Sequence, residues 1–146
     1  MTIRVDKDNA PVFTTLQQQR PPFIPEAAEA MTLLVEEPPG SPGLPPHRHS
    51  RPASGYVLEG EIVFELEGEP ERVIKAGETF WEPGGDVIHY QDANNLADAW
   101  TRFLVLMLCA PGQPMVIPVD AEELESRRDR RAPGPTERQT PIGGTT

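Results

Sequence analysis

Alternating apolar and polar side chains mark the middle of the chain. In the segment 61–67, Ile62, Phe64 and Leu66 occupy every second position, and Glu65 lies between two of them. Successive side chains of a strand point to opposite faces, so this period predicts a strand with one buried face and an acidic outer face. Glycine-containing turns flank the segment, which indicates that it reverses tightly into neighbouring strands.

Further short segments have strand-like patterns, at 31–37, 77–82, 87–91 and 101–110. Glycine and proline interrupt the chain between them, and the sequence contains 18 prolines and 12 glycines. Many short strands joined by such turns predict an all-β fold, built as a closed barrel or as two packed sheets. The last segment is apolar on both faces. Both faces should therefore be covered, by a second sheet with the N-terminal residues or by another subunit.

The two ends of the chain differ from this central part. A chain of 146 residues fits a single domain. Residues 1–30 are rich in proline and have poor periodicity, which predicts an arm that lies over a neighbouring surface. Residues 31–118 form the expected barrel. Residues 119–146 are expected to comprise one short helix, with Asp120 as its N-cap, and a mobile tail that is low in apolar residues.

The composition and net charge of the chain indicate which binding partners and which cellular compartment to expect. The net charge of −10 argues against nucleic acid as a partner, because binding to phosphates requires a concentrated basic face. No segment has the roughly 18 apolar residues of a membrane span, and the N-terminus lacks the pattern of a signal peptide. The single cysteine, Cys109, excludes an intramolecular disulfide and lies in an apolar run typical of a buried thiol. We therefore expect a cytoplasmic protein.

The three histidines of the chain all fall beside proline or glycine turns. His47 and His49 are two positions apart, so in a strand they point to the same side while Arg48 points away. His89 comes much later and opens another strand after a tight turn. Exposed loop histidines are the simpler interpretation of such residues, and a shared metal site is the alternative.

These residues resemble the two half-motifs of small single-domain cupins, H-x-H-x3-E-x6-G and G-x5-P-x-G-x2-H-x3-N. The residues that match in register are His47, His49, Gly60, Gly77, Pro83 and Gly85. His89 comes one residue late, and the spacing from His89 to Asn94 is again one residue too long. The resemblance covers roughly residues 31–118 and implies a cupin-type double-stranded β-helix, or jelly-roll barrel.

The resemblance also implies that His47, His49 and His89 hold a divalent transition metal, although the motif glutamate is missing and Ala53 takes its place. Iron, manganese, nickel, zinc and copper all accept imidazole, so this ligand set does not distinguish them. Three neutral imidazoles leave open coordination positions and the full 2+ charge of the ion. Such a centre favours anionic, bidentate oxygen ligands, such as an enolised diketone.

Two functions of different class follow from this resemblance. The first is an enzyme that oxygenates, isomerises or cyclises an enolisable small molecule, since some three-histidine cupins are diketone-cleaving dioxygenases and others act in polyketide cyclisation. The second is a non-catalytic cupin that binds a small ligand as a sensor or accessory protein. No helix-turn-helix pattern accompanies the barrel, which favours the enzyme. Cupins commonly pair, so the N-terminal arm and the doubly apolar segment 101–110 predict a homodimer.

Several side chains are candidates for a pocket around the metal. They are Gln91, Tyr56, Phe64, Ser54, Phe80 and Phe103. Gln91 follows His89 by two positions and should share its face, whereas most of the aromatic residues are expected in the core and some at the barrel mouth. Ser54 lacks a histidine or acid partner at motif spacing that would make it a nucleophile. Glu82 could replace the missing carboxylate or act as an acid or base, but a solvated strand residue is the more common case.

Overall fold

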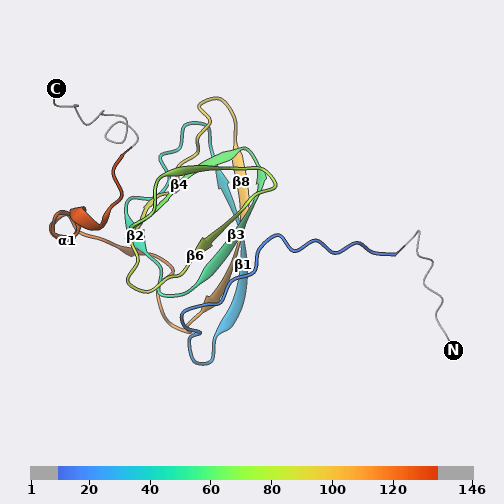
Figure 1. Cartoon of the computed structure of the whole chain (residues 1–146), viewed down its shortest axis with the longest axis horizontal. Coiled ribbons are helices and arrows are strands. Elements are labelled where there is room, and N and C mark those ends of the chain that lie inside the picture. Colours follow the sequence, from blue (N-terminus) through green and yellow to red (C-terminus); the bar gives the residue numbers. More distant parts are fainter. Residues whose placement is uncertain (1–9, 135–146) are drawn as a thin grey trace, which may run out of the picture.

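The computed structural model describes residues 10–134, which form two antiparallel sheets packed face to face (Figure 1). The first sheet contains, in order, β1 (Glu29–Glu37), β8 (Thr101–Cys109), β3 (Ala53–Glu59) and β6 (Thr79–Glu82). The second contains β5 (Arg72–Lys75), β4 (Glu61–Leu66), β7 (His89–Gln91), β2 (His47–Arg48) and β9 (Ile117–Pro118). The predicted all-β, double-sheet barrel is confirmed.

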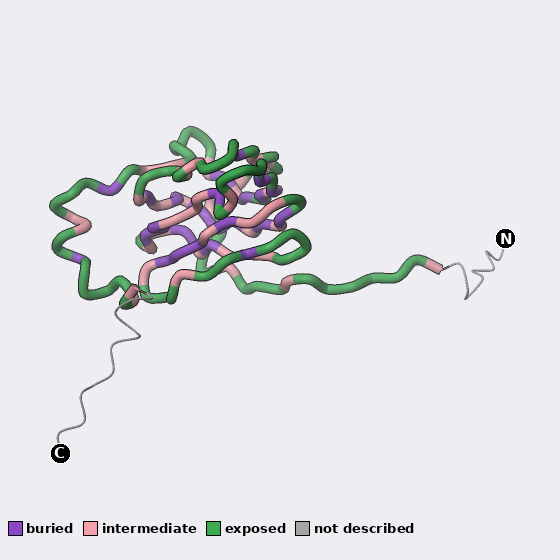
Figure 2. The backbone as a smooth tube through the Cα atoms, turned by 90° about the horizontal axis from the view of Figure 1, so that it is seen from above, coloured by how far each residue is buried: buried purple, intermediate pink, exposed green. Residues whose placement is uncertain are grey.

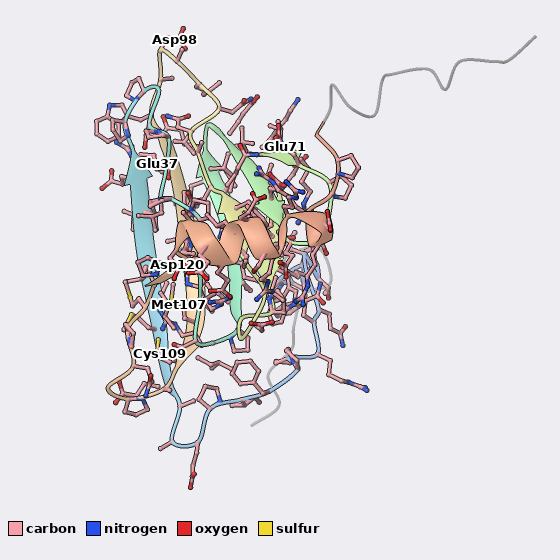
Figure 3. All side chains as sticks on the ribbon, turned by 90° about the vertical axis from the view of Figure 1, so that its left-hand side faces the viewer. Glu37, Glu71, Asp98, Met107, Cys109 and Asp120 are labelled. Atoms are coloured by element: carbon pink, nitrogen blue, oxygen red, sulfur yellow. The ribbon has the colours of Figure 1, made fainter. Side chains whose placement is uncertain are left out.

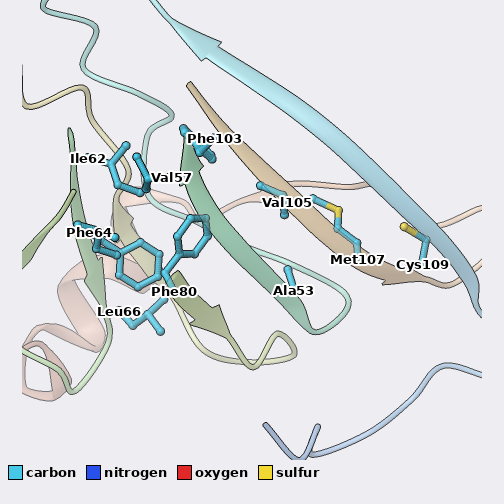
Figure 4. Close-up of a cluster of buried hydrophobic side chains, with 11 residues drawn as sticks. Ala53, Val57, Ile62, Phe64, Leu66, Phe80, Phe103, Val105, Met107 and Cys109 are labelled. Carbon is cyan, nitrogen blue, oxygen red and sulfur yellow. The ribbon is translucent and has the colours of Figure 1, made fainter. Parts of the chain in front are cut away.

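The core lies between the two sheets and takes side chains from both. Its buried members are Ala53, Val57, Ile62, Phe64, Leu66, Ile74, Phe80, Phe103, Val105, Met107 and Cys109 (Figure 4). Phe80 stands between two other rings, with ring centroids 5.1 Å from Phe64 and 5.8 Å from Phe103. The tube coloured by burial shows the same arrangement, with buried positions inside the barrel and an exposed N-terminal segment extending from it (Figure 2). The buried Cys109 agrees with the expectation from its apolar run.

Strand register places one row of residues across the first sheet. Met31 of β1 lies opposite Met107 of β8, and Met107 lies opposite Ala53 of β3. Ala53 in turn lies opposite Glu82 of β6. Residues directly opposite in an antiparallel pair point to the same face, so the row presents these side chains to the barrel interior. The position that holds alanine in place of the motif glutamate therefore has a carboxylate as its cross-strand neighbour.

The acidic outer face predicted for β4 is only partly exposed. Ile62, Phe64 and Leu66 are buried as expected, but Glu65 on the opposite face is also buried, with 4% of its surface exposed. Arg131, which follows the C-terminal helical turns, donates to both carboxylate oxygens of Glu65 at 2.8 Å. The expectation of a solvated glutamate was wrong because alternation along a strand identifies a face but not the distant segment that covers it.

Strand β8 has one fully covered face. Phe103, Val105, Met107 and Cys109 are buried, whereas Leu106 on the other face remains 55% exposed. Part of that outer face lies beside residues 14–17 of the N-terminal segment, where the Gln17 amide donates to the Phe80 carbonyl at 3.2 Å. The described chain thus leaves an apolar outer strip on the first sheet.

A short helix, α1 (Ala121–Ser126), follows the barrel and is capped by Asp120, whose carboxylate accepts from the Glu123 amide at 2.8 Å. The predicted short helix is followed by a 3-10 turn, η2 (Arg128–Arg130). Arg48 of β2 pairs with Glu123, which ties the helix to the strand that carries His47. The predicted mobile tail lies largely outside the described residues. None of the helices in the part of the chain that the structure describes is long and apolar enough to cross a bilayer.

Candidate metal centre

The three histidines converge inside the barrel, with His47 on β2, His89 on β7 and His49 directly after β2. His47 lies directly opposite His89 in the β2–β7 pair, so both side chains point to the same face. His49 follows two positions after His47 and joins them. All three are buried, and one ring nitrogen of each lies within 4.8 Å of the others.

Hydrogen bonds to backbone carbonyls fix two of the rings. His47 Nδ1 lies 2.8 Å from the Pro45 oxygen, and His49 Nδ1 lies 2.9 Å from the Met115 oxygen. A carbonyl only accepts, so each Nδ1 carries a proton and each neutral ring presents a lone pair at Nε2. These two Nε2 atoms lie 3.2 Å apart. Lone pairs facing at this distance repel unless a proton or a metal cation lies between them, so the residues fit a bound cation.

His89 completes the cluster from the facing strand. Among the described residues, neither of its ring nitrogens has a hydrogen-bond partner, although the side chain is only 5% exposed. Its ring packs against Phe64, with centroids 4.7 Å apart. Buried polar atoms nearly always have a partner, so His89 Nε2, which has no polar contact among the described residues, is a second indication that the cluster accommodates a ligand.

Glu82 is a fourth polar side chain at the cluster, and it is buried with 4% of its surface exposed. Its Oε1 atom lies 2.5 Å from His89 Nδ1 and 3.3 Å from His49 Nε2. The interpretation of Glu82 as a solvated strand residue was wrong. Phe80 and Glu82 share one face of β6, and that face is turned to the core.

Burial and mutual charges set the ionisation of the cluster. Burial would raise the pKa of Glu82, but the adjacent His49 and His89 hold it well below its usual range. Burial lowers the pKa of His47, and the neighbouring imidazoles of His89 and His49 lower it further. Burial also opposes the charged form of His49, yet Glu82 outweighs this effect and raises the pKa of His49 above its ordinary value. The centre therefore carries a fixed negative charge that attracts a proton or a metal ion.

A cavity of about 340 Å³ opens beside the cluster. Its polar lining near the centre consists of His49, Glu82 and His89, and most of its wall is apolar. The apolar residues are Leu33, Val35, Leu44, Ile62, Phe64, Phe80, Phe103, Val105, Met107, Met115 and Val116. A concave, mainly apolar space with a few convergent polar groups is the usual form of a small-molecule site.

A second polar end of the same cavity contains Glu37 and Asp92. Met31 of β1 lies in the same cross-strand row as Glu82. Glu37 is further along β1, so at the rise of a strand it lies roughly 20 Å from Met31. Figure 3 shows Glu37 and Met107 at different heights of the first sheet. Glu37 is 7% exposed, and its Oε2 atom has no hydrogen-bond partner within residues 10–134. Burial, with a smaller contribution from the charge of Asp92, raises the pKa of Glu37 to about 7.

The structure separates the predicted pocket residues into two groups. Phe64, Phe80 and Phe103 line the cavity. Ser54 and Tyr56 do not, because they point to the opposite face of β3 from the buried Ala53 and Val57.

Gln91 also lies outside the cavity, although it is two positions after His89. A bulge in the β4–β7 pair aligns Leu66 with His89 but Glu65 with Gln91, so one extra residue on β7 breaks the alternation. The Gln91 amide faces outward and donates to Glu65 and Glu71 at 2.6 and 2.8 Å. The bulge falls between His89 and Asn94, where the cupin pattern is also one residue too long.

Glu37 is a polar residue of this cavity that the sequence interpretation did not include. A signal was present in the alternation of Leu33, Val35 and Glu37, which places a carboxylate on the same face as two core residues. The predicted strand 31–37 was correct, but its faces were not assigned.

Comparisons with known proteins agree with this geometry. The family model described as "Cupin domain" matches residues 33–106. A search of proteins with curated descriptions finds no significant match. Among solved structures, DMSP lyase DddQ from Ruegeria pomeroyi DSS-3 matches with 27% identity and a TM-score of 0.51, over 60% of this chain and 42% of its own.

Two further solved structures are similar to this chain. Oxalate oxidase in complex with the substrate analogue glycolate matches with 24% identity and a TM-score of 0.51, over 68% of this chain and 56% of its own. The polyketide cyclase RemF from Streptomyces resistomycificus matches with 27% identity and a TM-score of 0.48, over 62% of this chain and 61% of its own. The chain thus spans less than half of the DMSP lyase. The family match covers half of this chain and includes β2, β7 and the histidines that they carry, so the chain belongs to the cupin family.

Proposed function

We propose that this chain is a metal-dependent enzyme that acts on a small molecule with a chelating oxygen group, such as an enolisable or diketone-like group. The observation that carries the proposal is the orientation of His47 and His49. Backbone carbonyls accept both Nδ1 protons, so both Nε2 lone pairs face one point beside the buried ring of His89, whose Nε2 has no hydrogen-bond partner among the described residues. A divalent transition metal held by these rings would polarise a bound oxygen and stabilise negative charge that develops on it.

The chain's own side chains would position the rest of the substrate. The aromatic wall formed by Phe64, Phe80 and Phe103 excludes water from the centre and contacts an apolar body. At the far end, the unpartnered Oε2 atom of Glu37 is available to a polar group of the ligand. A carboxyl whose pKa lies near 7 can donate a proton in a hydrogen bond or accept one at neutral pH. The substrate expected for this cavity therefore has a chelating oxygen end, an apolar middle and a second polar group.

Dioxygenase, isomerase and cyclase activities all suit such a substrate. The resemblance to DMSP lyase DddQ supports an enzymatic role over a purely sensory one. Because the chain spans only 42% of that protein, the resemblance supports the type of site and not its substrate.

The first test is metal content. Protein purified without added metal is analysed for bound elements, beside His49→Ala and a control, Ser54→Ala, which changes a side chain on the opposite face of the sheet. We expect one equivalent of a transition metal in the wild type and in Ser54→Ala, and loss of that metal in His49→Ala. A folded wild type that binds no added zinc, cobalt or iron would contradict the proposal.

The second test separates an enzyme from a binding protein. Tropolone is an anionic, bidentate oxygen ligand whose absorption changes when it binds a metal. We expect it to bind the metal-loaded protein and to compete with true substrates in a panel of diketones and hydroxy-ketones analysed by mass spectrometry. Stoichiometric binding of tropolone without turnover of any panel member would instead favour the non-catalytic, ligand-binding function.

We further propose that two copies of the chain associate through the outer face of the first sheet. Leu106 on that face is 55% exposed and Leu34 beside it is 54% exposed. In the N-terminal segment, Val12 and Phe13 are 90% and 92% exposed, on an extended stretch that leaves the barrel (Figure 1). Apolar side chains exposed to this extent on an arm favour contact with a second copy.

A further inference from the structure

The cupin pattern places a glutamate at the position of Ala53, and this chain lacks it. Ala53 lies at the start of β3, directly opposite Glu82 of β6. The Cβ atoms of opposite residues in an antiparallel pair lie about 4.5–5.5 Å apart and point to the same face. A carboxylate at position 82 can therefore reach the space that a carboxylate at position 53 would occupy.

The atoms of Glu82 lie where a metal ligand would lie. Two atoms bound to one ion at about 2.1 Å are about 3.0 to 3.4 Å apart when the angle between them is about 90° to 109°. His47 Nε2 and His49 Nε2 are separated by 3.2 Å, and Glu82 Oε1 lies 3.3 Å from His49 Nε2. The carboxylate thus lies at a ligand-like distance from His49 Nε2, whereas its 2.5 Å contact with His89 Nδ1 is shorter than this range.

The contacts of Glu82 with His49 and His89 indicate a role as a metal ligand, beyond the orientation of a histidine ring. A carboxylate that only orients a ligating histidine accepts from the ring nitrogen that faces away from the metal. In His49 that nitrogen is Nδ1, which is already bound to the Met115 carbonyl, so Oε1 approaches the metal-facing Nε2. Its contact with His89 Nδ1 is short, yet neither atom makes a hydrogen bond of normal geometry.

We propose that Glu82 is the fourth protein ligand of this metal centre, and that it replaces the motif glutamate from the neighbouring strand. The inference rests on the proposed metal site. It changes the charge of that site, because one carboxylate reduces the net charge of a divalent centre from 2+ to 1+. A monoanionic, bidentate oxygen ligand then yields a neutral complex inside the apolar cavity. The proposal therefore favours a singly charged chelating group, such as an enolate or one carboxylate.

Cobalt(II) titration of the metal-free protein, followed by visible absorption, tests this assignment. Cobalt(II) reports both the affinity and the number and type of its ligands. The variants are Glu82→Gln, Glu82→Ala and the double variant Ala53→Glu/Glu82→Ala, which moves the carboxylate back to the motif position. Glu36→Ala is the charge control, because Glu36 is an exposed carboxylate paired with Arg102. His49→Ala reports on the histidine site itself.

We expect Glu82→Gln and Glu82→Ala to weaken cobalt binding more than tenfold and to change the absorption bands. The double variant should regain most of the affinity and the original bands, and Glu36→Ala should behave as the wild type. If the double variant does not fold, as judged by circular dichroism, Glu82→Gln decides alone, because its amide keeps the shape of the carboxyl.

Two results would overturn the assignment. Glu82→Gln could bind cobalt with unchanged affinity, or with weaker affinity but the original bands, which would make Glu82 a positioning residue. In both cases His49→Ala still loses cobalt and the proposed metal site stands. Wild-type binding by His49→Ala would refute the proposed function instead.

Discussion

Gly55 lies directly opposite Phe80 in the β3–β6 pair, and a Cβ atom built on Gly55 would lie 1.9 Å from the Phe80 ring. The absence of a side chain at position 55 therefore lets the Phe80 ring cover the sheet beside the cavity. The row of Ala53 and Glu82 is the next one on the same face, so Gly55 also affects the wall next to the proposed metal centre.

Gly55→Ala should displace the Phe80 ring and destabilise the protein. Overpacking of a well-filled core costs about 1–3 kcal/mol. The free energy of unfolding, measured by urea denaturation, should fall by this amount, whereas Ser54→Ala on the outer face should change it by less than about 0.5 kcal/mol. Equal denaturation midpoints for Gly55→Ala and the wild type would contradict the close approach of Gly55 and Phe80.

Glu37 should make stability depend on pH. Its pKa is raised from 4.5 to about 7 in the folded protein, so the folded state holds a proton that the unfolded state has lost between these values. Stability is then lost as the pH rises from about 4.5 to 7, because the unfolded state binds fewer protons over that range. Glu37→Gln removes this loss. It should be more stable than the wild type at pH 8, by at most about 3 kcal/mol, and the difference should shrink toward pH 4.

Urea denaturation at pH 4, 6 and 8 measures this effect. Glu36→Gln is the matched control, since the adjacent carboxylate is exposed and pairs with Arg102 at the surface. Its difference from the wild type should be small at each pH. A stability difference between Glu37→Gln and the wild type that is the same at pH 4 and pH 8 would show that Glu37 does not titrate as described.

The sequence predicted the fold better than it predicted the polar residues of the site. The period of Ile62, Phe64 and Leu66 identified a strand and its core face, because this pattern depends only on neighbours along the chain. Convergence of His47, His49 and His89 could be inferred because their spacing resembles the two cupin half-motifs, whose histidines meet in the folded barrel. The burial of Glu82 was not predicted, because a lone glutamate in a strand is usually solvated. Its position on the same face as Phe80 was a sign of burial.

Other differences arise from contacts that no local pattern contains. Glu65 is buried because Arg131, far along the chain, covers it. Gln91 turns away from the cavity because of a bulge, and one extra residue reverses the side-chain direction that alternation predicts. Both effects depend on the pairing partner and not on the strand's own sequence.

Arg127 should be a main attachment of the C-terminal helix to the barrel. Its guanidinium lies 2.5 Å from Glu67, 2.9 Å from Asp86 and 3.3 Å from Glu123, and the side chain is 9% exposed. Arg127→Met would leave the largely buried Glu67 without its cation, which should cost about 1–3 kcal/mol of unfolding free energy. Arg128→Met is the control, because Arg128 is 71% exposed and pairs only with Glu125 among the ion pairs of the described chain.

Thermal denaturation followed by circular dichroism compares these two arginine variants. The midpoint of Arg127→Met should fall by several degrees, and that of Arg128→Met should match the wild type. Because the Arg127–Glu67 pair is largely shielded from solvent, whereas the Asp86 partner is exposed, added salt should reduce the difference only partly. Equal midpoints for the two variants would show that the helix is held by other contacts.

The proposed association of two copies predicts a concentration-dependent mass. Light scattering at micromolar concentration should give twice the chain mass of 16.1 kDa. Phe13→Ser and Leu106→Ser each remove an exposed apolar side chain from the arm or the outer sheet face, so each should shift the equilibrium toward the monomer. Val73→Ser is the control, because Val73 is 41% exposed on β5 in the other sheet and should leave the mass unchanged. A wild type that stays monomeric at these concentrations would refute the association, and monomerisation by Val73→Ser would move the interface to the second sheet.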